Sequence, residues 1–123
     1  MNPFPTDENR MRIIQEYVPG CQVTLAHIIA SPDKILYEKL GLDPRLDYEK
    51  AAIGITTVTP SETAIIMADI AMKASGINLG FVDRFSGSLI FTGTVSEVQA
   101  GLEAQLSYLK DKLGYTVCDI TKT

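Results

Sequence analysis

The chain has 123 residues, of which 46% are hydrophobic, and this length and composition fit a single domain with one apolar core. Its 15 acidic and 11 basic residues give a net charge of −4, which argues against nucleic-acid binding because phosphates need clustered Lys and Arg. No apolar run reaches the roughly 18 residues of a membrane span, and no secretory leader is recognisable. Two isolated cysteines, Cys21 and Cys118, fit a reduced, cytoplasmic protein.

The first twenty residues are predicted to be an extension of the domain that spans 21–123. Residues 1–10 are polar and contain two prolines, which indicates a terminus that is loose or is ordered by a partner. Residues 11–18 favour a strand, and Pro19-Gly20 interrupts the chain after it. Since no neighbouring segment offers a partner, this strand is expected to pair outside the core.

The next β-α unit comprises 22–41. Residues 22–30 are apolar almost throughout, which is typical of a strand inside a covered sheet. Ser31-Pro32-Asp33 is expected to begin a short helix that ends at Gly41. Its predicted apolar stripe is Ile35, Leu36 and Leu40, and the charged stretch 42–50 is read as a connector.

A second strand, 52–58, leads into an unusually apolar helix. Thr59 at N-cap, Pro60 at N1 and Glu62 at N3 are expected to begin this helix, and Gly76 to close it. Its charges lie on one narrow stripe, where Asp69 and Lys73 are spaced for an i,i+4 pair. A helix that is apolar almost all round is buried on more than its core face, which predicts subunit contacts.

The remaining elements are a hairpin, a long helix and a final strand. The hairpin pairs 78–85 with 89–93 around the turn Ser86-Gly87-Ser88. A capping box from Thr94 to Glu97 begins a helix over 95–113, which Gly114 ends. Residues 115–121 alternate and are predicted to form a strand. The helix stripe expected to face the sheet is Val95, Val98, Leu102, Leu106, Leu109 and Leu113.

Reactive groups do not converge anywhere in this pattern. His27 lies in an apolar strand, where a core or interface role is favoured over catalysis, and one His with two distant Cys cannot form a zinc site. The glycines have turn, cap or packing explanations, and no phosphate loop follows a strand. Asp83 and Arg84 are read as a local ion pair, solvated or at an interface, in preference to a catalytic pair. The sequence therefore favours assembly or binding over catalysis, with no cofactor and no metal.

Two stretches carry a resemblance to a known family. Residues 69–74 read Asp-Ile-Ala-Met-Lys-Ala, and 78–89 contain Asp83-Arg84-Phe85-Ser86-Gly87. Both resemble the first helix and hairpin of the bacterial microcompartment shell domain. The unit 23–40 resembles one that comes last in the standard domain, so the order of elements resembles a circular permutation. Residues 12–20 and 80–87 are similar to the permuted single-domain branch of EutS and PduU type, with its choline-utilisation relatives.

The resemblance implies an α+β fold, a circularly permuted ferredoxin-like domain whose antiparallel sheet has helices on one side. It implies a cyclic hexamer that tiles into the shell of an ethanolamine, propanediol or choline utilisation microcompartment in the cytoplasm, without catalysis. Lys73 would lie at the hexamer edge, although a solvated surface Lys is equally compatible with the sequence. The hairpin or pore loop would be Phe85, Ser86, Gly87 and Ser88. An axial β-barrel between subunits would be formed by Arg12, Ile13, Ile14, Gln15, Glu16, Tyr17 and Val18.

The implied partners are further copies of the chain, other shell proteins and targeting peptides of encapsulated enzymes, with no nucleic acid and no membrane. An alternative from another class is a small-molecule-sensing α+β regulatory domain that binds a metabolite between subunits, because split β-α-β topologies also support such sites. A trimeric enzyme with shared sites is a third and less favoured reading, since it needs an acid-base set across an interface.

Overall fold

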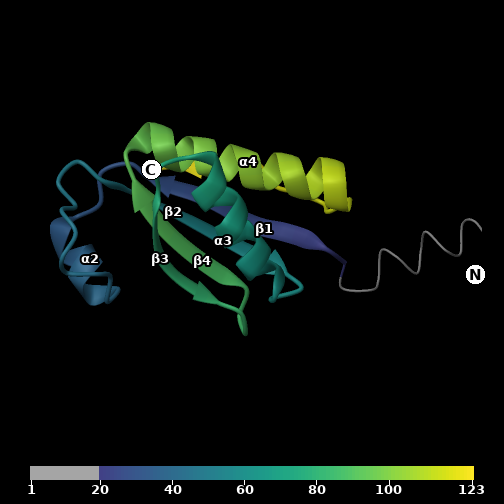
Figure 1. The fold of residues 1–123 in the computed structure, drawn as a ribbon, viewed down its shortest axis with the longest axis horizontal. Coiled ribbons are helices and arrows are strands. Elements are labelled where there is room, and N and C mark those ends of the chain that lie inside the picture. The colour runs from purple at the N-terminus through teal and green to yellow at the C-terminus, as the bar shows by residue number, and fades with distance from the viewer. Residues whose placement is uncertain (1–19) are drawn as a thin grey trace, which may run out of the picture.

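A five-stranded sheet with the strand order β3-β4-β2-β1-β5 is the centre of the fold in the computed structural model, which describes residues 20–123 (Figure 1). The predicted α+β class is confirmed. One pair departs from the predicted antiparallel sheet, since β1 and β5 run parallel while the other neighbours are antiparallel. The strands are β1 (Gln22–Ile29), β2 (Ala52–Thr59), β3 (Asn78–Asp83), β4 (Ser88–Gly93) and β5 (Thr121–Lys122).

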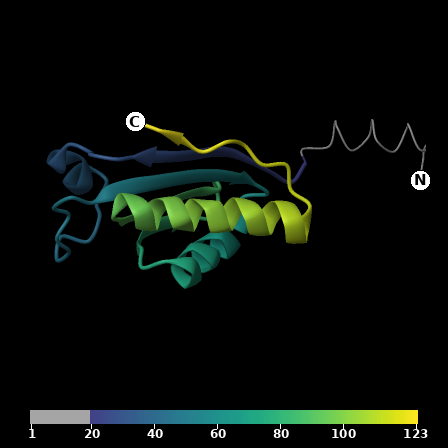
Figure 2. The same cartoon turned by 90° about the horizontal axis from the view of Figure 1, so that it is seen from above.

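Two helices cover one face of this sheet, as Figure 2 shows: α3 (Thr63–Ala74) and α4 (Val95–Leu113). Close approach of α4 depends on glycine, because a Cβ at Gly54 of β2 would lie 2.8 Å from Val98 Cγ1. The main core lies between the helices and the sheet. Its largest fully buried side chains include Phe91, Ile28, Met67, Leu89, Leu102 and Leu109.

The opposite face of the sheet is covered at one end by α2 (Lys34–Lys39) and the segment after it. Tyr37 and Leu42 pack there against Ile53 and Ile90. The rest of this face is more open, and Leu25 of β1 is exposed. The expectation that the first strand lies in a covered sheet therefore holds on the side of α3 and α4, where Val23, Ala26 and Ile28 are buried, and is wrong for the opposite face. The predicted α2 stripe is also corrected: Tyr37 is the buried residue of this helix and Ile35 is exposed.

The beginning and end of α3 differ from the prediction. Thr59 stays in β2, paired with Gln22, and a tight turn follows in which the Thr63 N–H donates to the Pro60 carbonyl at 3.0 Å. Glu62 is the N-cap residue and makes no side-chain capping bond. The helix ends at Ser75 in an extended conformation, so Gly76 is not a left-handed cap. A Cβ at Gly76 would instead lie 2.9 Å from Glu97 Oε2.

Other boundaries confirm the local signals. The α4 capping box forms between Thr94 and Glu97, and Gly114 ends the helix with φ of 72°. Gly41 likewise follows α2 with φ of 72°, although Asp33 rather than Ser31 caps its first turn.

The predicted strand 115–121 is wrong over most of its length. Only Thr116, in an isolated bridge to Gln22, and the two residues of β5 pair with β1. The chain between them packs against the core through Tyr115, Val117, Cys118 and Ile120.

Candidate assembly surfaces

The outward face of α3 is apolar and is not covered by any other part of residues 20–123. Its inner face, with Ala64, Met67 and Ala71, is buried in the core. On the other side Ile65 and Met72 are each 52% exposed, and Ile66 is also exposed. Because soluble chains rarely leave such a patch in water, this face is suited to contact with another molecule, as the all-round apolar pattern predicts.

Lys73 lies beside this patch and lines a groove of about 340 Å³ between α3 and α4. Its side chain is 76% exposed and its Nζ lies 2.8 Å from Asp69 Oδ2, which is the predicted i,i+4 pair. The hydrogen bond to Asp69 raises the pKa of Lys73, so the ammonium stays charged. The groove is lined by Ile66, Asp69, Ile70, Lys73, Ala74 and Tyr108.

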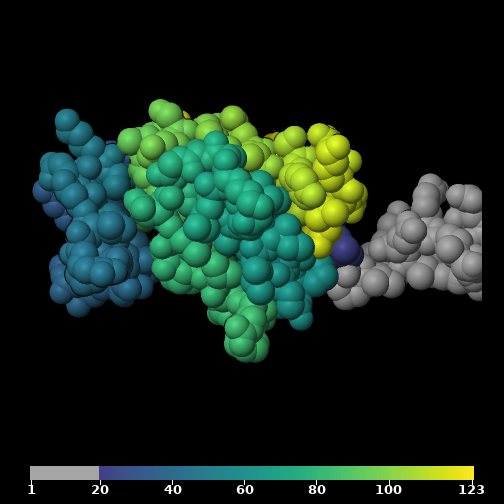
Figure 3. All heavy atoms as spheres, viewed as in Figure 1, coloured from purple at the N-terminus to yellow at the C-terminus, as the bar shows by residue number. Residues whose placement is uncertain are grey.

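The hairpin between β3 and β4 projects from the body of the molecule, at the bottom of the view in Figure 3. Phe85 at its tip is 81% exposed. Asp83 holds the tip, because Oδ1 accepts from the Phe85 N–H at 2.9 Å and Oδ2 accepts from Ser86 Oγ at 2.9 Å. These hydrogen bonds, the one from the Phe85 backbone first, lower the pKa of Asp83.

The predicted Asp83–Arg84 ion pair is wrong, because Asp83 is committed to the backbone of the turn. The Arg84 guanidinium lies instead over the Phe85 ring, 4.8 Å from its centroid. Gly87 then returns the chain to the sheet with φ of 82°, and its carbonyl accepts from the Val58 N–H at 3.0 Å. The tip therefore presents an aromatic ring and a guanidinium on a backbone that hydrogen bonds fix in place.

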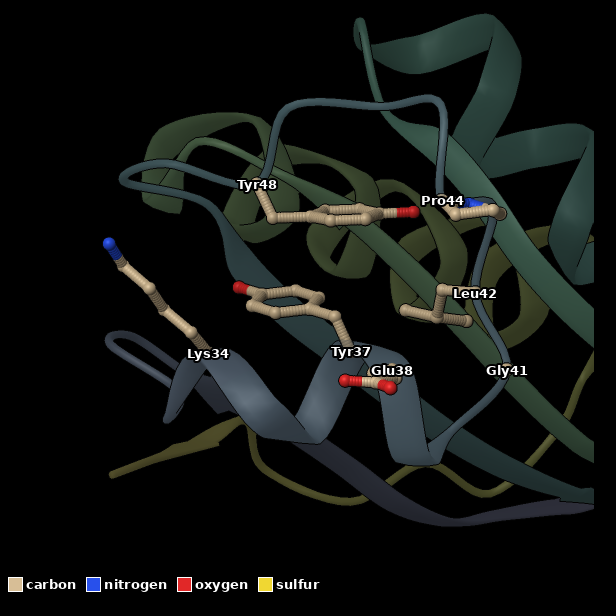
Figure 4. A pocket seen from close by; sticks show the side chains of 7 residues that line it. All are labelled: Lys34, Tyr37, Glu38, Gly41, Leu42, Pro44 and Tyr48. Carbon is tan, nitrogen blue, oxygen red and sulfur yellow. The ribbon is translucent and has the colours of Figure 1, made fainter.

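A pocket of about 570 Å³ lies beside α2, on the side of the sheet away from α3 and α4 (Figure 4). Tyr37 and Tyr48 stack with their centroids 4.3 Å apart and their planes 9° apart. Each hydroxyl donates to a backbone carbonyl at 2.8 Å, Tyr37 to Ala51 and Tyr48 to Asp43. Burial raises the pKa of Tyr37, so the phenol stays protonated.

Sequence reasoning missed this pocket because it treated 42–50 as a connector. The available signal was a tyrosine on each side of the Gly41 to Pro44 turn. The residues that line the pocket are Lys34, Tyr37, Glu38, Gly41, Leu42, Pro44 and Tyr48.

The remaining candidate groups are structural in this geometry. His27 bonds through its two ring nitrogens to the hydroxyls of Thr121 and Thr123, the second at 2.9 Å, and so ties β1 to the C-terminal strand. Burial raises the pKa of Cys118, which keeps it a thiol. Among residues 20–123 no group of three metal-ligating side chains comes together. No helix in this part of the chain is long and apolar enough to cross a bilayer.

The predicted site residues occupy separate places. Lys73 lines the groove between α3 and α4. Phe85 to Gly87 form the tip of the hairpin, whereas Ser88 of the predicted loop already belongs to β4 and pairs with Asp83. The proposed barrel residues, 12–18, and the domain boundary at residue 20 lie outside the described residues or at their limit.

The fold is thus that of a small α+β sheet domain with an exposed apolar helix face suited to contact with other molecules. The family model described as the BMC domain matches residues 52–120. The chain belongs to the BMC-domain family. Its β1 and α2 precede the matched region, which is the order that a permuted domain requires.

Several curated proteins are close relatives. The bacterial microcompartment shell protein CutR of Streptococcus intermedius is 51% identical over 112 residues, which are 91% of this chain and 92% of CutR. PduU of Salmonella typhimurium is 50% identical, over 91% of this chain and 93% of PduU. EutS of the same species is 50% identical, over 94% of this chain and 99% of EutS. The resemblance to this branch is thereby confirmed.

Solved structures agree with the relatives. A structure described as a CutR flat hexamer has a TM-score of 0.79 and 51% identity, and the match covers 91% of this chain and 99% of that one. A fused permuted hexameric shell protein, MSM0275, has a TM-score of 0.62 at 24% identity and shows the fold alone. These relatives are shell proteins, so they give no support to the metabolite-sensing alternative.

Proposed function

We propose that this chain is a structural shell protein of a bacterial microcompartment and performs no catalysis. Its copies close into a hexamer, and hexamers meet edge to edge as tiles of the shell. The observation that carries the proposal is 50% or 51% identity to CutR, PduU and EutS over at least 91% of the chain. The match to a flat hexamer of CutR supports the same arrangement, and the uncovered face of α3 gives it a physical basis.

The mass of the assembly tests this proposal directly. Six copies of a 13.4 kDa chain give a ring of about 80 kDa, closed by rotational symmetry. Sedimentation at micromolar concentration should show this species, and sheets should form at higher concentration. A stable monomer over the same range would overturn the proposal.

The N-terminal strand, 12–18, is proposed to pair with its copies around the ring axis, where closure into a barrel removes its exposed edges. Deletion of 1–18 should leave a soluble ring of six that lacks the axial density in electron microscopy. Deletion of 1–10 is the matched control and should keep that density. If the longer deletion unfolds the domain, the strand belongs to the core and the barrel assignment is wrong.

The hairpin tip, Phe85 to Ser88, is proposed to lie at the axis of the ring. Its exposed Phe85 and Arg84 support a position where copies of the tip face one another. Further partners are other shell proteins and the targeting peptides of encapsulated enzymes. The corresponding location is the shell of a microcompartment that serves ethanolamine, propanediol or choline utilisation.

A further inference from the structure

We propose that the pocket beside α2 binds a small organic molecule that carries an aromatic ring and, on a short alkyl chain, an ammonium group. The volume of the pocket, about 570 Å³, lies within the roughly 300–1,000 Å³ that is typical of small-molecule sites. The pocket lies on the side of the sheet away from α3 and is separate from the apolar face of that helix. The inference is therefore independent of the ring and tile arrangement proposed above.

The wall of the pocket is fixed before a ligand binds. Tyr37 and Tyr48 stack with their centroids 4.3 Å apart, and each hydroxyl donates to a backbone carbonyl at 2.8 Å. One of these carbonyls belongs to Asp43, whose carboxylate accepts from the Arg45 guanidinium at 3.0 and 2.9 Å. A wall fixed in this way loses little side-chain entropy on binding, which favours occupancy by a small ligand.

The apolar part of the wall favours an aromatic group. Both tyrosine rings line the pocket, but each covers one face of the other, so their edges are what a ligand meets; Figure 4 shows both rings edge-on. Ring edges carry partial positive charge and pack well against the negative face of another aromatic ring. Leu42 and Pro44 add apolar surface beside the rings. The two hydroxyl protons are already donated to carbonyls and are not available to a ligand.

The charges at the rim of the pocket favour a cation. Two of the lining side chains, Lys34 and Glu38, are charged at neutral pH. The Lys34 ammonium points away from the apolar wall in Figure 4 and already contacts Glu49 at 3.4 Å. The Glu38 carboxylate takes part in no ion pair within residues 20–123. It is therefore the uncompensated charge beside the rings, and the net charge of −4 on the chain adds to its attraction for a cation.

A short alkyl chain is enough to join the two parts of the ligand. Glu38 directly follows Tyr37 on α2, and Figure 4 shows the Glu38 carboxylate beside Tyr37. A ring that packs against the tyrosine edges therefore needs only a short linker to place its ammonium at Glu38.

Three probes test the proposal on the full-length chain by saturation-transfer NMR. Tryptamine carries both the ring and the ammonium, and we expect it to bind with a Kd of about 1 mM, in keeping with its size. Indole-3-propionate has the same ring and a carboxylate in place of the ammonium. It should bind about tenfold more weakly, because Glu38 repels it instead of attracting it. Butylamine keeps the ammonium without the ring and should show no binding at about 10 mM.

A matched pair of variants and the leucine methyl signals locate the site. Glu38→Gln should weaken tryptamine binding about fourfold, because it removes the ion pair and keeps the shape of the side chain. Glu103→Gln makes the same change on α4, at the other face of the sheet, and should leave the Kd within twofold. In the unchanged chain, tryptamine should shift the methyl signals of Leu42 and leave those of Leu113, an exposed leucine of α4, in place.

Several outcomes would overturn the proposal. They are no tryptamine binding at about 10 mM, equal affinity for the two indole probes, butylamine binding as tight as that of tryptamine, and equal weakening by the two variants. A methyl shift at Leu113 without one at Leu42 would also overturn it. None of these results bears on the proposed shell function, which the mass of the assembly tests separately.

Discussion

Gly87 is the residue on which the hairpin tip depends most. Its φ of 82° is the left-handed region, and an added Cβ would overlap the carbonyl oxygen of Val58. Gly87→Ala should therefore cost about 3 kcal/mol, from about 1–2 kcal/mol of backbone strain and a comparable steric term. Urea unfolding followed by circular dichroism measures this loss.

Gly114 is the matched control, since its φ is 72° and nothing lies within 4 Å of an added Cβ. Gly114→Ala should cost only about 1 kcal/mol of backbone strain. Equal losses at the two positions would show that the contact with Val58 is absent in solution.

Asp83 gives the same tip a dependence on pH. Hydrogen bonds to the carboxylate, first from the Phe85 N–H, hold the folded pKa of Asp83 below the ordinary value of 3.8. The stabilisation is thus complete above the unfolded pKa of about 4 and is lost as the pH falls through the lower folded pKa. The amide signals of Phe85 and Ser86 should shift below pH 4, as NMR titration can follow.

Asp83→Asn is the control for that titration. It keeps one carbonyl acceptor but cannot ionise, so the acid-induced shift of the two amide signals should vanish. A shift that persists in the variant, or a midpoint above pH 4 in the unchanged chain, would contradict the assignment of the tip to the Asp83 carboxylate.

Among the elements, α4 was the most predictable, because its signals are local. Thr94 Oγ1 accepts from the Glu97 N–H at 3.2 Å, and Glu97 Oε1 accepts from the Thr94 N–H at 2.9 Å. Thr94→Ala removes one half of this capping box and should cost about 1 kcal/mol. Ser96→Ala lies in the same first turn outside the box and should change stability by less than about 0.5 kcal/mol. Thermal unfolding measures the loss of stability in both variants. Equal losses would show that the capping box does not stabilise α4.

The start of α3 was not predictable from the same local signals. Thr59 and Pro60 read as a cap and first turn, but the ladder with Gln22 keeps Thr59 in β2, so the helix begins three residues after Pro60. Gly76 was misread for a related reason, because its lack of a side chain serves the close approach of Glu97. Both boundaries of α3 are decided by contacts with segments distant in the sequence. Local sequence patterns do not show such pairing and packing.

The candidate surfaces divide in the same way. The apolar outward face of α3 was predictable from composition, because the few charges of this helix lie on one stripe and the other sides are apolar. The α2 pocket was not, since it exists only when Tyr37 of the helix stacks on Tyr48 of the loop. The tyrosines on each side of the Gly41 to Pro44 turn are visible in the sequence, but their stacking depends on how the loop folds back on the helix.

For the whole molecule, the decisive question is what the α3 surface contacts in the assembly. The exposed Lys73 ammonium, held by Asp69 at 2.8 Å beside the exposed Met72, is proposed to lie where hexamers meet. Lys73→Ala should leave the ring mass unchanged, because the apolar contacts within each ring remain. It should raise the protein concentration needed for sheets about tenfold, which corresponds to about 1.4 kcal/mol per contact. Lys110→Ala removes an exposed charge from α4 and should leave that threshold within twofold. Electron microscopy over a concentration series gives the concentration at which each variant forms sheets. Sheets that form at the same concentration in Lys73→Ala and the unchanged chain would place Lys73 away from the edge, and a change in ring mass would place it inside the ring.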